Sequence, residues 1–297
     1  MAAITVAAAT MGSNFDPVLV KDLFSKVQGH SSLATLSGQQ PIGFTGNKYM
    51  VFNMPNEVDI VAEGGKKSHG GLTLDPVTVV PIKFEYGARV SDEFMTASEE
   101  YQLEVLRQFN DGFAKKLARG MDLAGMHGVN PRTGEASEVV GANNFDSKVS
   151  QKVTYAAAKA DENLDAAIAM VQGADGDVNG MALSTAFGGA MAQIKANGIA
   201  QYPEFRFGQK PTTFAGLTCD VNKTVSDAGT DQAIVGDFAN AFRWGFAKEI
   251  PMEIIPYGDP DNSGVDLKGS NQVYIRAEAY IGWGILDPKA FARIVTE

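Results

Sequence analysis

Few side chains in this sequence could carry out chemistry. The 297 residues include three histidines and one cysteine. His30, His69 and His127 lie in different segments, without the spacing of a metal site, so ordinary polar positions are favoured. Cys219 lies in a strand-like stretch, where a small buried residue is favoured over a nucleophile. Because the cysteine is alone, no intrachain disulfide can form, which indicates a reducing compartment.

Three glycine-rich segments resemble ligand-binding motifs, but each departs where the chemistry is demanding. An EF-hand loop needs a bidentate carboxylate at position 12, and the loops that begin at Asp175 and Asp259 have Ala186 and Ser270 there. The stretch around Lys66 lacks the first glycine of a phosphate-binding loop and the hydroxyl that follows its lysine. We interpret the two acidic loops as solvated turns. The sequence therefore predicts no catalytic residue, no metal site and no cofactor.

The composition favours architecture over catalysis. Glycine is abundant, with 32 residues, and 25 basic against 35 acidic side chains give a net charge of −10. Both halves of the chain are acidic, which argues against a sequence-reading nucleic-acid binder and a polybasic membrane anchor. No apolar run reaches the roughly 18 residues of a membrane span, and the start lacks the basic region of a signal peptide. The length predicts one large or two medium domains.

Residues 1–40 have the pattern of an arm and not of a packed unit. A short amphipathic helix is expected over 17–27, with Phe24 on its apolar face. The Ala- and Thr-rich start has no core of its own, and such a segment is ordered only where another surface holds it. A neighbouring subunit is the simplest candidate for that surface.

A long β-hairpin is expected next. The outgoing strand covers 47–62, the tip 63–71 contains four glycines, and the return strand covers 72–90. The second half of the return strand alternates apolar and polar side chains from Ile82 onward, which is typical of a half-buried strand. A two-stranded hairpin is only marginally stable in water, so we expect it to contact something outside its own domain.

The strongest helix signal lies over 96–124. Thr96 and Glu99 have the spacing of a capping box, and basic side chains gather toward the helix end, as the helix dipole favours. A helix of about 30 residues is roughly 45 Å long. A glycine-rich exit follows at 125–134. The apolar stripe consists of Leu103, Leu106, Phe113, Leu117, Met121 and Ala124.

The remainder reads as mixed α/β. The alternation from Val273 to Trp283 predicts a second half-buried strand, and Asp287 is expected to cap a final helical turn through Phe291. The acidic loop 257–270 precedes that strand. Helices are expected over 163–171 and 185–196, and strands over 181–184, 212–218, 233–237 and 252–255.

The order of these elements resembles the Hong Kong 97-type major capsid proteins of tailed double-stranded DNA phages. The resemblance covers nearly the whole chain, and its strength comes from the order and spacing of the matching stretches, since none is specific by itself. They are Val61-Ala-Glu-Gly-Gly-Lys66 with the later Val80–Phe94, then Phe113–Asp122 with Gly128–Gly134, then Ala233-Ile-Val-Gly-Asp-Phe238, and finally Val273–Glu278 with Asp287–Phe291.

The resemblance implies an α+β fold with a discontinuous domain. The long helix, about 96–124, would be the spine helix of the family. The parts would be an N-arm (1–40), an extended loop (41–88), a peripheral domain (89–155 and 265–297) and an axial domain (156–264).

It also implies a function and partners. The chain would self-assemble into the hexamers and pentamers of an icosahedral shell in the host cytoplasm and remain in the virion capsid. Its partners would be further copies of itself, a separate scaffolding protein, a portal protein and loosely contacted double-stranded DNA, with a decoration protein left open. The negative net charge fits a container for DNA, since a basic inner wall would bind the DNA phosphates tightly. Subunit contacts are expected at Phe24, Glu63, Lys66, Lys67, Arg89, Arg119, Asp237, Arg276 and Glu278.

Some relatives join an extended-loop lysine to an asparagine of a neighbouring subunit. Lys66 or Lys67 with Asn262 or Asn271 could act in this way, but ordinary ion pairs or solvated lysines are favoured.

Two alternatives to the phage capsid stay open at this point. One is the shell protein of an encapsulin nanocompartment, which shares the fold and encloses enzymes. The other is a glycine-rich α/β enzyme or binding module that works as a small oligomer.

Overall fold

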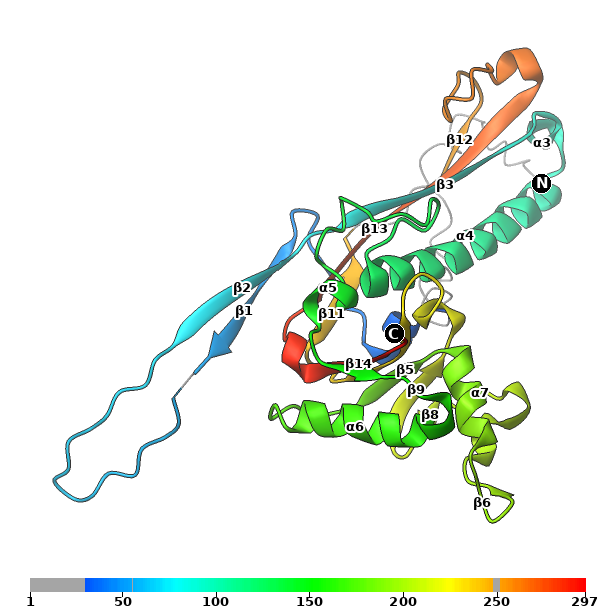
Figure 1. The fold of residues 1–297 in the computed structure, drawn as a ribbon. Coiled ribbons are helices and arrows are strands. Elements are labelled where there is room, and N and C mark those ends of the chain that lie inside the picture. Colours follow the sequence, from blue (N-terminus) through cyan, green and yellow to red (C-terminus); the bar gives the residue numbers. More distant parts are fainter. Residues whose placement is uncertain (1–29, 55, 248–251) are drawn as a thin grey trace, which may run out of the picture.

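The computed structural model describes residues 30–54, 56–247 and 252–297. The helix expected over 17–27, with Phe24, lies outside the described residues. The described part has a body of two packed sheets, a long helix beside one of them, and a hairpin that extends far from the body (Figure 1). A short helix, α2 (Ser32–Leu36), is buried in the body.

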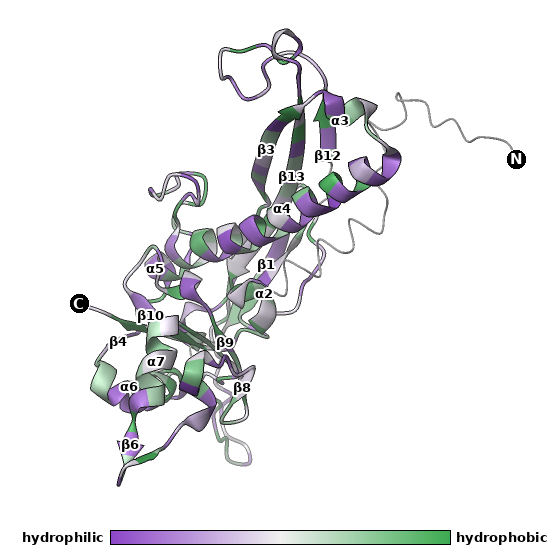
Figure 2. Ribbon diagram, turned by 90° about the vertical axis from the view of Figure 1, so that its right-hand side faces the viewer, coloured by the Kyte–Doolittle hydropathy of each residue, from purple (hydrophilic) through white to green (hydrophobic). Residues whose placement is uncertain are grey.

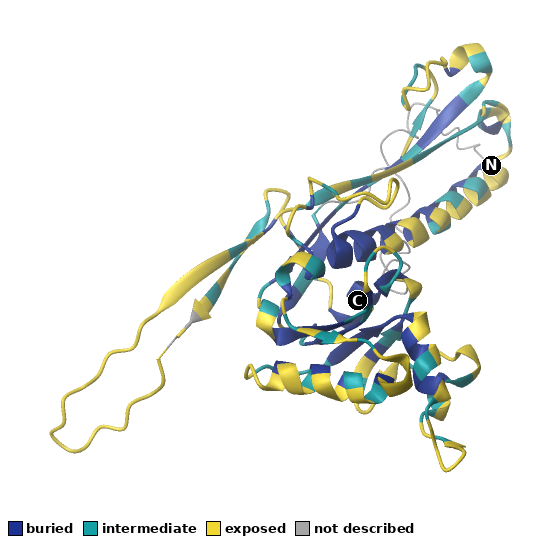
Figure 3. Cartoon of the chain, in the orientation of Figure 1, coloured by how far each residue is buried: buried dark blue, intermediate teal, exposed yellow. Residues whose placement is uncertain are grey.

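The hairpin consists of β1 (Asn47–Asn53) and β2 (Thr73–Val79), which pair antiparallel from Asn47↔Val79 to Asn53↔Thr73. The strand expected to reach residue 62 ends at Asn53, and the described residues from 54 to 72 have no strand partner. These residues are exposed (Figure 3), so no sheet neighbour or core extends the ladder further. The hairpin is thus a short ribbon that carries a long open loop.

The return strand is divided at Pro81, whose ring nitrogen cannot donate a ladder hydrogen bond. Its second part, β3 (Ile82–Ser91), leaves β2 and pairs antiparallel with β13 (Gln272–Ile285) in the body. The expected boundary between residues 88 and 89 lies inside this strand. Val79 is fully buried, and the bare Cα atoms of Gly282 and Gly284 in β13 allow its close approach.

β13 is the centre of a four-stranded sheet. It pairs with β3, with β12 (Met252–Ile255) and with β11 (Phe242–Phe246), a strand that the sequence patterns did not indicate. The alternation expected from Val273 is confirmed: Val273, Ile275, Ala277, Ala279, Ile281 and Trp283 are all buried.

The long helix is α4 (Glu99–His127), which follows the short α3 (Glu93–Thr96) and lies along the four-stranded sheet (Figure 1). Its N-cap is Ser98, whose hydroxyl accepts from the Tyr101 amide at 3.4 Å, so the capping box expected at Thr96 is wrong by two residues. Thr96 already ends α3. Hydrophilic and hydrophobic residues alternate along α4 (Figure 2), and its expected stripe is buried except for Leu103, which is 58% exposed.

α4 also continues three residues beyond its expected end. Gly125 remains helical, because its missing side chain leaves room for Leu33 of α2: an added Cβ would lie 2.7 Å from the Leu33 Cδ1 atom. The helix ends where Gly128 adopts a left-handed conformation with φ of 70°. Tertiary packing therefore outweighs the low helix propensity of glycine here.

The second sheet has six strands. Their order is β4 (Lys152–Thr154), β14 (Phe291–Val295), β10 (Asp231–Gly236), β5 (Gly180–Leu183), β9 (Leu217–Val221) and β8 (Thr213–Phe214). Asp287 caps a single 3-10 turn, Pro288–Ala290, and β14 starts at Phe291, so the last helical turn is shorter than expected. Helices α6 (Ala160–Gln172) and α7 (Thr185–Gln193) pack on this sheet.

The six-stranded sheet separates two hydrophobic cores. Ala182, Ile234 and Phe291 face the core shared with α4 and the four-stranded sheet, whereas their neighbours Met181 and Val235 face α6 and α7. Both faces are therefore buried (Figure 3). The remaining short elements are α5 (Phe145–Lys148), β6 (Lys195–Ala196), β7 (Ile199–Ala200) and the 3-10 turns Ala157–Lys159, Pro203–Gly208, Lys223–Val225 and Lys268–Ser270.

Candidate functional site

The hairpin carries an apolar surface that nothing in the described part of the chain covers. Val58 and Ile60 in the open loop are 93% and 96% exposed, and Phe52 in β1 is 63% exposed. A group of this kind is rare on a monomeric soluble protein and marks a surface for contact. We call it the hairpin surface, and its members are Met50, Phe52, Met54, Val58, Ile60, Leu72 and Leu74.

The expected contact residues of the loop tip, Glu63, Lys66 and Lys67, are exposed beside the hairpin surface. The tip lies at the opposite end of the molecule from the loop that contains Asn262 and Asn271 (Figure 1). Any contact between these lysines and those asparagines would therefore join two chains. Whether such a contact becomes covalent stays a prediction.

Arg89, another expected contact residue, binds the acidic loop of its own chain. Its Nη2 atom donates to the Asp259 carboxylate at 2.8 Å and to the Val265 carbonyl at 2.9 Å, and it also pairs with Asp261. The Arg89 hydrogen bond lowers the pKa of Asp261 well below its usual value. The loop is largely exposed, in agreement with its interpretation as a solvated turn, and the Arg89 guanidinium near the end of β3 additionally holds it in place.

The other charged residues expected at subunit contacts also have partners within the chain. Arg119 pairs with Asp227, and Asp237 accepts from the backbone N–H of Asn240 at 2.9 Å. On the four-stranded sheet, Arg276 pairs with Glu253 at 2.7 Å, and Glu278 with Lys83 at 2.6 Å. Their role between subunits stays a prediction. Within the subunit these pairs fasten neighbouring strands and loops.

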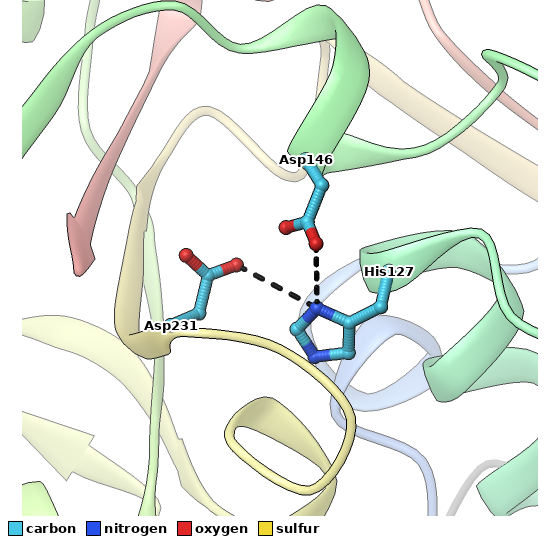
Figure 4. Close-up of side chains that lie close together, drawn as sticks. All are labelled: His127, Asp146 and Asp231. Atoms are coloured by element: carbon cyan, nitrogen blue, oxygen red, sulfur yellow. Dashed lines mark hydrogen bonds and ion pairs between the residues drawn. The ribbon is translucent and has the colours of Figure 1, made fainter. Parts of the chain in front are cut away.

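A cluster of charged side chains that the sequence did not reveal lies between α4 and the six-stranded sheet (Figure 4). It consists of His127, Asp146, Asp231 and Arg293, which we call the buried charge cluster. The His127 Nδ1 atom lies 3.1 Å from Asp146 Oδ2 and 4.0 Å from Asp231 Oδ2. Arg293 donates from Nε to Asp231 at 2.9 Å and pairs with Asp146 as well. The four residues are far apart in sequence, and no spacing pattern could have joined them.

The donor set of the cluster does not suit a metal ion. Three potential ligand atoms, from His127, Asp146 and Asp231, lie within 4.8 Å of one another. However, both Asp231 oxygens already accept from the Arg293 Nε atom, at 2.9 and 3.2 Å, and Asp146 pairs with the same guanidinium. A cation would have to displace or approach a fixed positive charge. The cluster is therefore balanced by the charges of its own side chains.

A second buried carboxylate, Asp122, lies one turn earlier on α4. It accepts from the backbone amides of Ser32 and Leu33 at 3.0 and 3.2 Å and from the Thr224 hydroxyl at 2.8 Å. The Ser31 hydroxyl is its fourth donor. Burial raises the pKa of Asp122 to about 6 although these donors favour the charged form. The carboxylate thus holds the start of α2 against α4.

Cys219 is confirmed as a buried residue, with 1% of its surface exposed. Burial raises the pKa of its thiol to about 12, so the thiolate is scarce at neutral pH. None of the helices in the described part of the chain is long and apolar enough to cross a membrane.

Comparisons with known proteins agree with the fold. The model of the phage capsid family matches residues 16–296. A solved structure from Mycobacterium phage Ogopogo is 33% identical, with a TM-score of 0.78, over 90% of this chain and 92% of that chain. A structure from Gordonia phage Cozz is 26% identical, with a TM-score of 0.73, over 90% and 87%. No curated protein matches the chain.

A more distant structure shares the fold. The capsid of a native GTA particle, determined with C5 symmetry, is 15% identical, with a TM-score of 0.65 over 89% of each chain. The comparisons support neither the encapsulin nor the enzyme alternative. With the Hong Kong 97-type fold now supported by family and structure alike, the chain belongs to the phage capsid family and is a structural major capsid protein of a bacteriophage shell.

Proposed function

We propose that the chain forms the hexamers and pentamers of an icosahedral shell and that the hairpin surface docks on a neighbouring copy. The exposure of Val58, Ile60 and Phe52 carries this proposal. Fully burying an exposed side chain of this size contributes about 1.5–3 kcal/mol. Several such side chains on one hairpin supply a substantial part of a subunit contact.

The hairpin and the body are different surfaces of the chain, so their contact is heterologous. Contacts of this kind close into rings when the rotation between copies permits. The fivefold symmetry of the related GTA capsid supports ring closure for this chain. The open loop around Gly64, where φ is 76°, can differ in shape between hexamers and pentamers.

The remaining partners follow from the same reading. The net charge of −10 favours loose contact with packaged double-stranded DNA, because few fixed cations are available to hold phosphates. A separate scaffolding protein, a portal protein and assembly in the host cytoplasm complete the proposal. A decoration protein stays open. The proposed parts keep their expected bounds: N-arm 1–40, extended loop 41–88, peripheral domain 89–155 and 265–297, axial domain 156–264.

Electron microscopy of particles made in cells with the proposed scaffolding protein tests the docking of the hairpin. Ile60→Asp should abolish closed shells while the soluble subunit keeps its thermal stability, because Ile60 touches no core. Ile60→Leu is the matched control and should assemble normally, since it keeps an apolar side chain of the same volume. Deletion of residues 64–71 should also spare the subunit and impair closure. Normal shell yield from Ile60→Asp would refute the docking role of the hairpin surface.

A further inference from the structure

Both ring nitrogens of His127 face only hydrogen-bond acceptors. Nε2 lies 3.1 Å from the Val225 carbonyl oxygen, and Nδ1 lies 3.1 Å from Asp146 Oδ2. The side chain has no exposed surface. A neutral imidazole carries one N–H and one lone pair, whereas an imidazolium carries two N–H groups. Only the imidazolium satisfies both neighbours, because a carbonyl cannot donate and a carboxylate donates only when it is itself protonated.

The charges around the ring require the same proton. Asp146 from α5 and Asp231 from β10 are two carboxylates, and Arg293 from β14 supplies one positive charge. With both carboxylates ionised, an imidazolium makes this buried group neutral, whereas a neutral ring leaves one negative charge uncompensated. His127 is also the last residue of α4, where the helix dipole favours a cation.

The ring is covered by the loop between β9 and β10, residues 222–230. This loop touches α4 through Thr224 and Asp122, through the Val225 carbonyl and His127, and through Asp227 and Arg119. Gly229 lies directly over the ring, since an added Cβ there would be 2.3 Å from His127 Nδ1. Of these contacts, the one through His127 depends on the proton of the imidazolium.

We propose that His127 is held as an imidazolium and acts as a proton-dependent latch that fastens the loop 222–230 to the end of the long helix. Loss of the proton leaves a ring nitrogen without a hydrogen facing either the Val225 carbonyl or the Asp146 carboxylate. The loop then loosens, and with it the connection between α4 and the six-stranded sheet.

The direction of the pH dependence follows from the groups that face the ring. Burial disfavours the charged ring, but the hydrogen bond and charge of Asp146, with the charge of Asp231, outweigh it and raise the pKa of His127. Burial also raises the pKa of Asp231 to about 7. Both groups hold a proton more firmly in the folded chain, so their stabilisation is present at low pH and is lost as pH rises. Asp146, whose pKa is lowered, weakens the cluster only in acid.

Nuclear magnetic resonance of the imidazole nitrogens in the assembled protein tests the protonation state directly. The chain has three histidines, and His30→Gln and His69→Gln identify the signals of His127. We expect His127 to remain an imidazolium at pH 7, above the ordinary histidine midpoint of about 6.5. A neutral His127 ring at pH 7 would overturn the proposal, whether or not any variant of His127 folds.

Hydrogen exchange of the loop amides tests the latch. After correction for intrinsic exchange, protection of residues 222–230 should fall by up to about tenfold per pH unit from the ordinary histidine midpoint of about 6.5 up to the raised midpoint of His127, and should level off above it. His127→Gln should show weak protection at both pH 6 and pH 8.5, and the exposed control His69→Gln should match the unaltered chain. Protection that does not change between these pH values in the unaltered chain, or that keeps its pH dependence in His127→Gln, contradicts a latch at His127.

Discussion

Replacing Asp122 by Asn should destabilise the subunit by an amount that depends on pH. The carboxylate is fully buried, and its oxygens accept from different backbone amides, so the amide nitrogen of Asn would face either the Ser32 or the Leu33 amide. An unsatisfied buried donor costs about 1–3 kcal/mol. With one backbone amide affected, the fixed part of the loss is about 1–3 kcal/mol, and shifts of α2 reduce it.

A second part of the loss depends on pH, because Asp122 ionises and Asn does not. The pKa of Asp122 is about 6 in the folded chain against 3.8 for an ordinary Asp, so the ionised carboxylate is disfavoured in the folded state. Stability from this group is greatest below pH 3.8 and is lost as pH rises through 6. A difference of about two pKa units corresponds to about 3 kcal/mol. Asn cannot ionise, so Asp122→Asn should cost about 2 kcal/mol more at pH 4.5 than at pH 7.5.

Urea unfolding of unassembled subunits, followed by tryptophan fluorescence, measures this difference. Trp244 and Trp283 are both buried, and the Trp244 indole donates to the Ser37 carbonyl directly after α2. With a urea m-value of about 3 kcal/mol per molar, 3 kcal/mol moves the midpoint by about 1 M. Glu104→Gln, exposed on the same helix, is the control and should move the midpoint little. A loss in Asp122→Asn that is equal at pH 4.5 and 7.5 would refute the account of the buried carboxylate.

Three further predictions concern other parts of the chain. Phe84→Asp should unfold the subunit or lower its yield sharply, because Phe84 packs against Trp283 and α4. Circular dichroism checks this, and the control Leu103→Asp, at an exposed position, should fold. Gly112→Ala should raise stability by about 0.5–1 kcal/mol, since nothing lies near its Cα, whereas Gly125→Ala should lose that gain against Leu33; equal thermal shifts would contradict the packing. Arg89→Ala should make the loop 257–266 more sensitive to protease at unchanged far-ultraviolet dichroism, and an unchanged cleavage pattern would mean that Arg89 does not order the loop.

Periodic patterns in the sequence predicted the elements that have one buried face. The alternation from Val273 to Trp283 predicted β13, and the stripe that includes Leu106 and Phe113 predicted α4, because a half-buried element repeats with the period of its backbone. β14 was missed since Phe291, Ala292 and Ile294 are buried on both faces of its sheet, which removes the alternation. The predicted end of α4 was wrong because a glycine such as Gly125 usually ends a helix. Here Gly125 stays in the helix, since its packing against Leu33 leaves no room for a side chain.

The sequence alone showed few groups suited to chemistry and predicted a hairpin too thin to be stable alone and one long helix, and the order of its elements resembled that of phage capsid proteins. Local composition and spacing are enough for these properties. Only the tertiary structure decided which charges meet. It placed Arg89 on the acidic loop, Asp122 at the start of α2, and His127 between two carboxylates and a carbonyl. Such pairs join residues distant in sequence, and their energies depend on burial, which no local pattern contains.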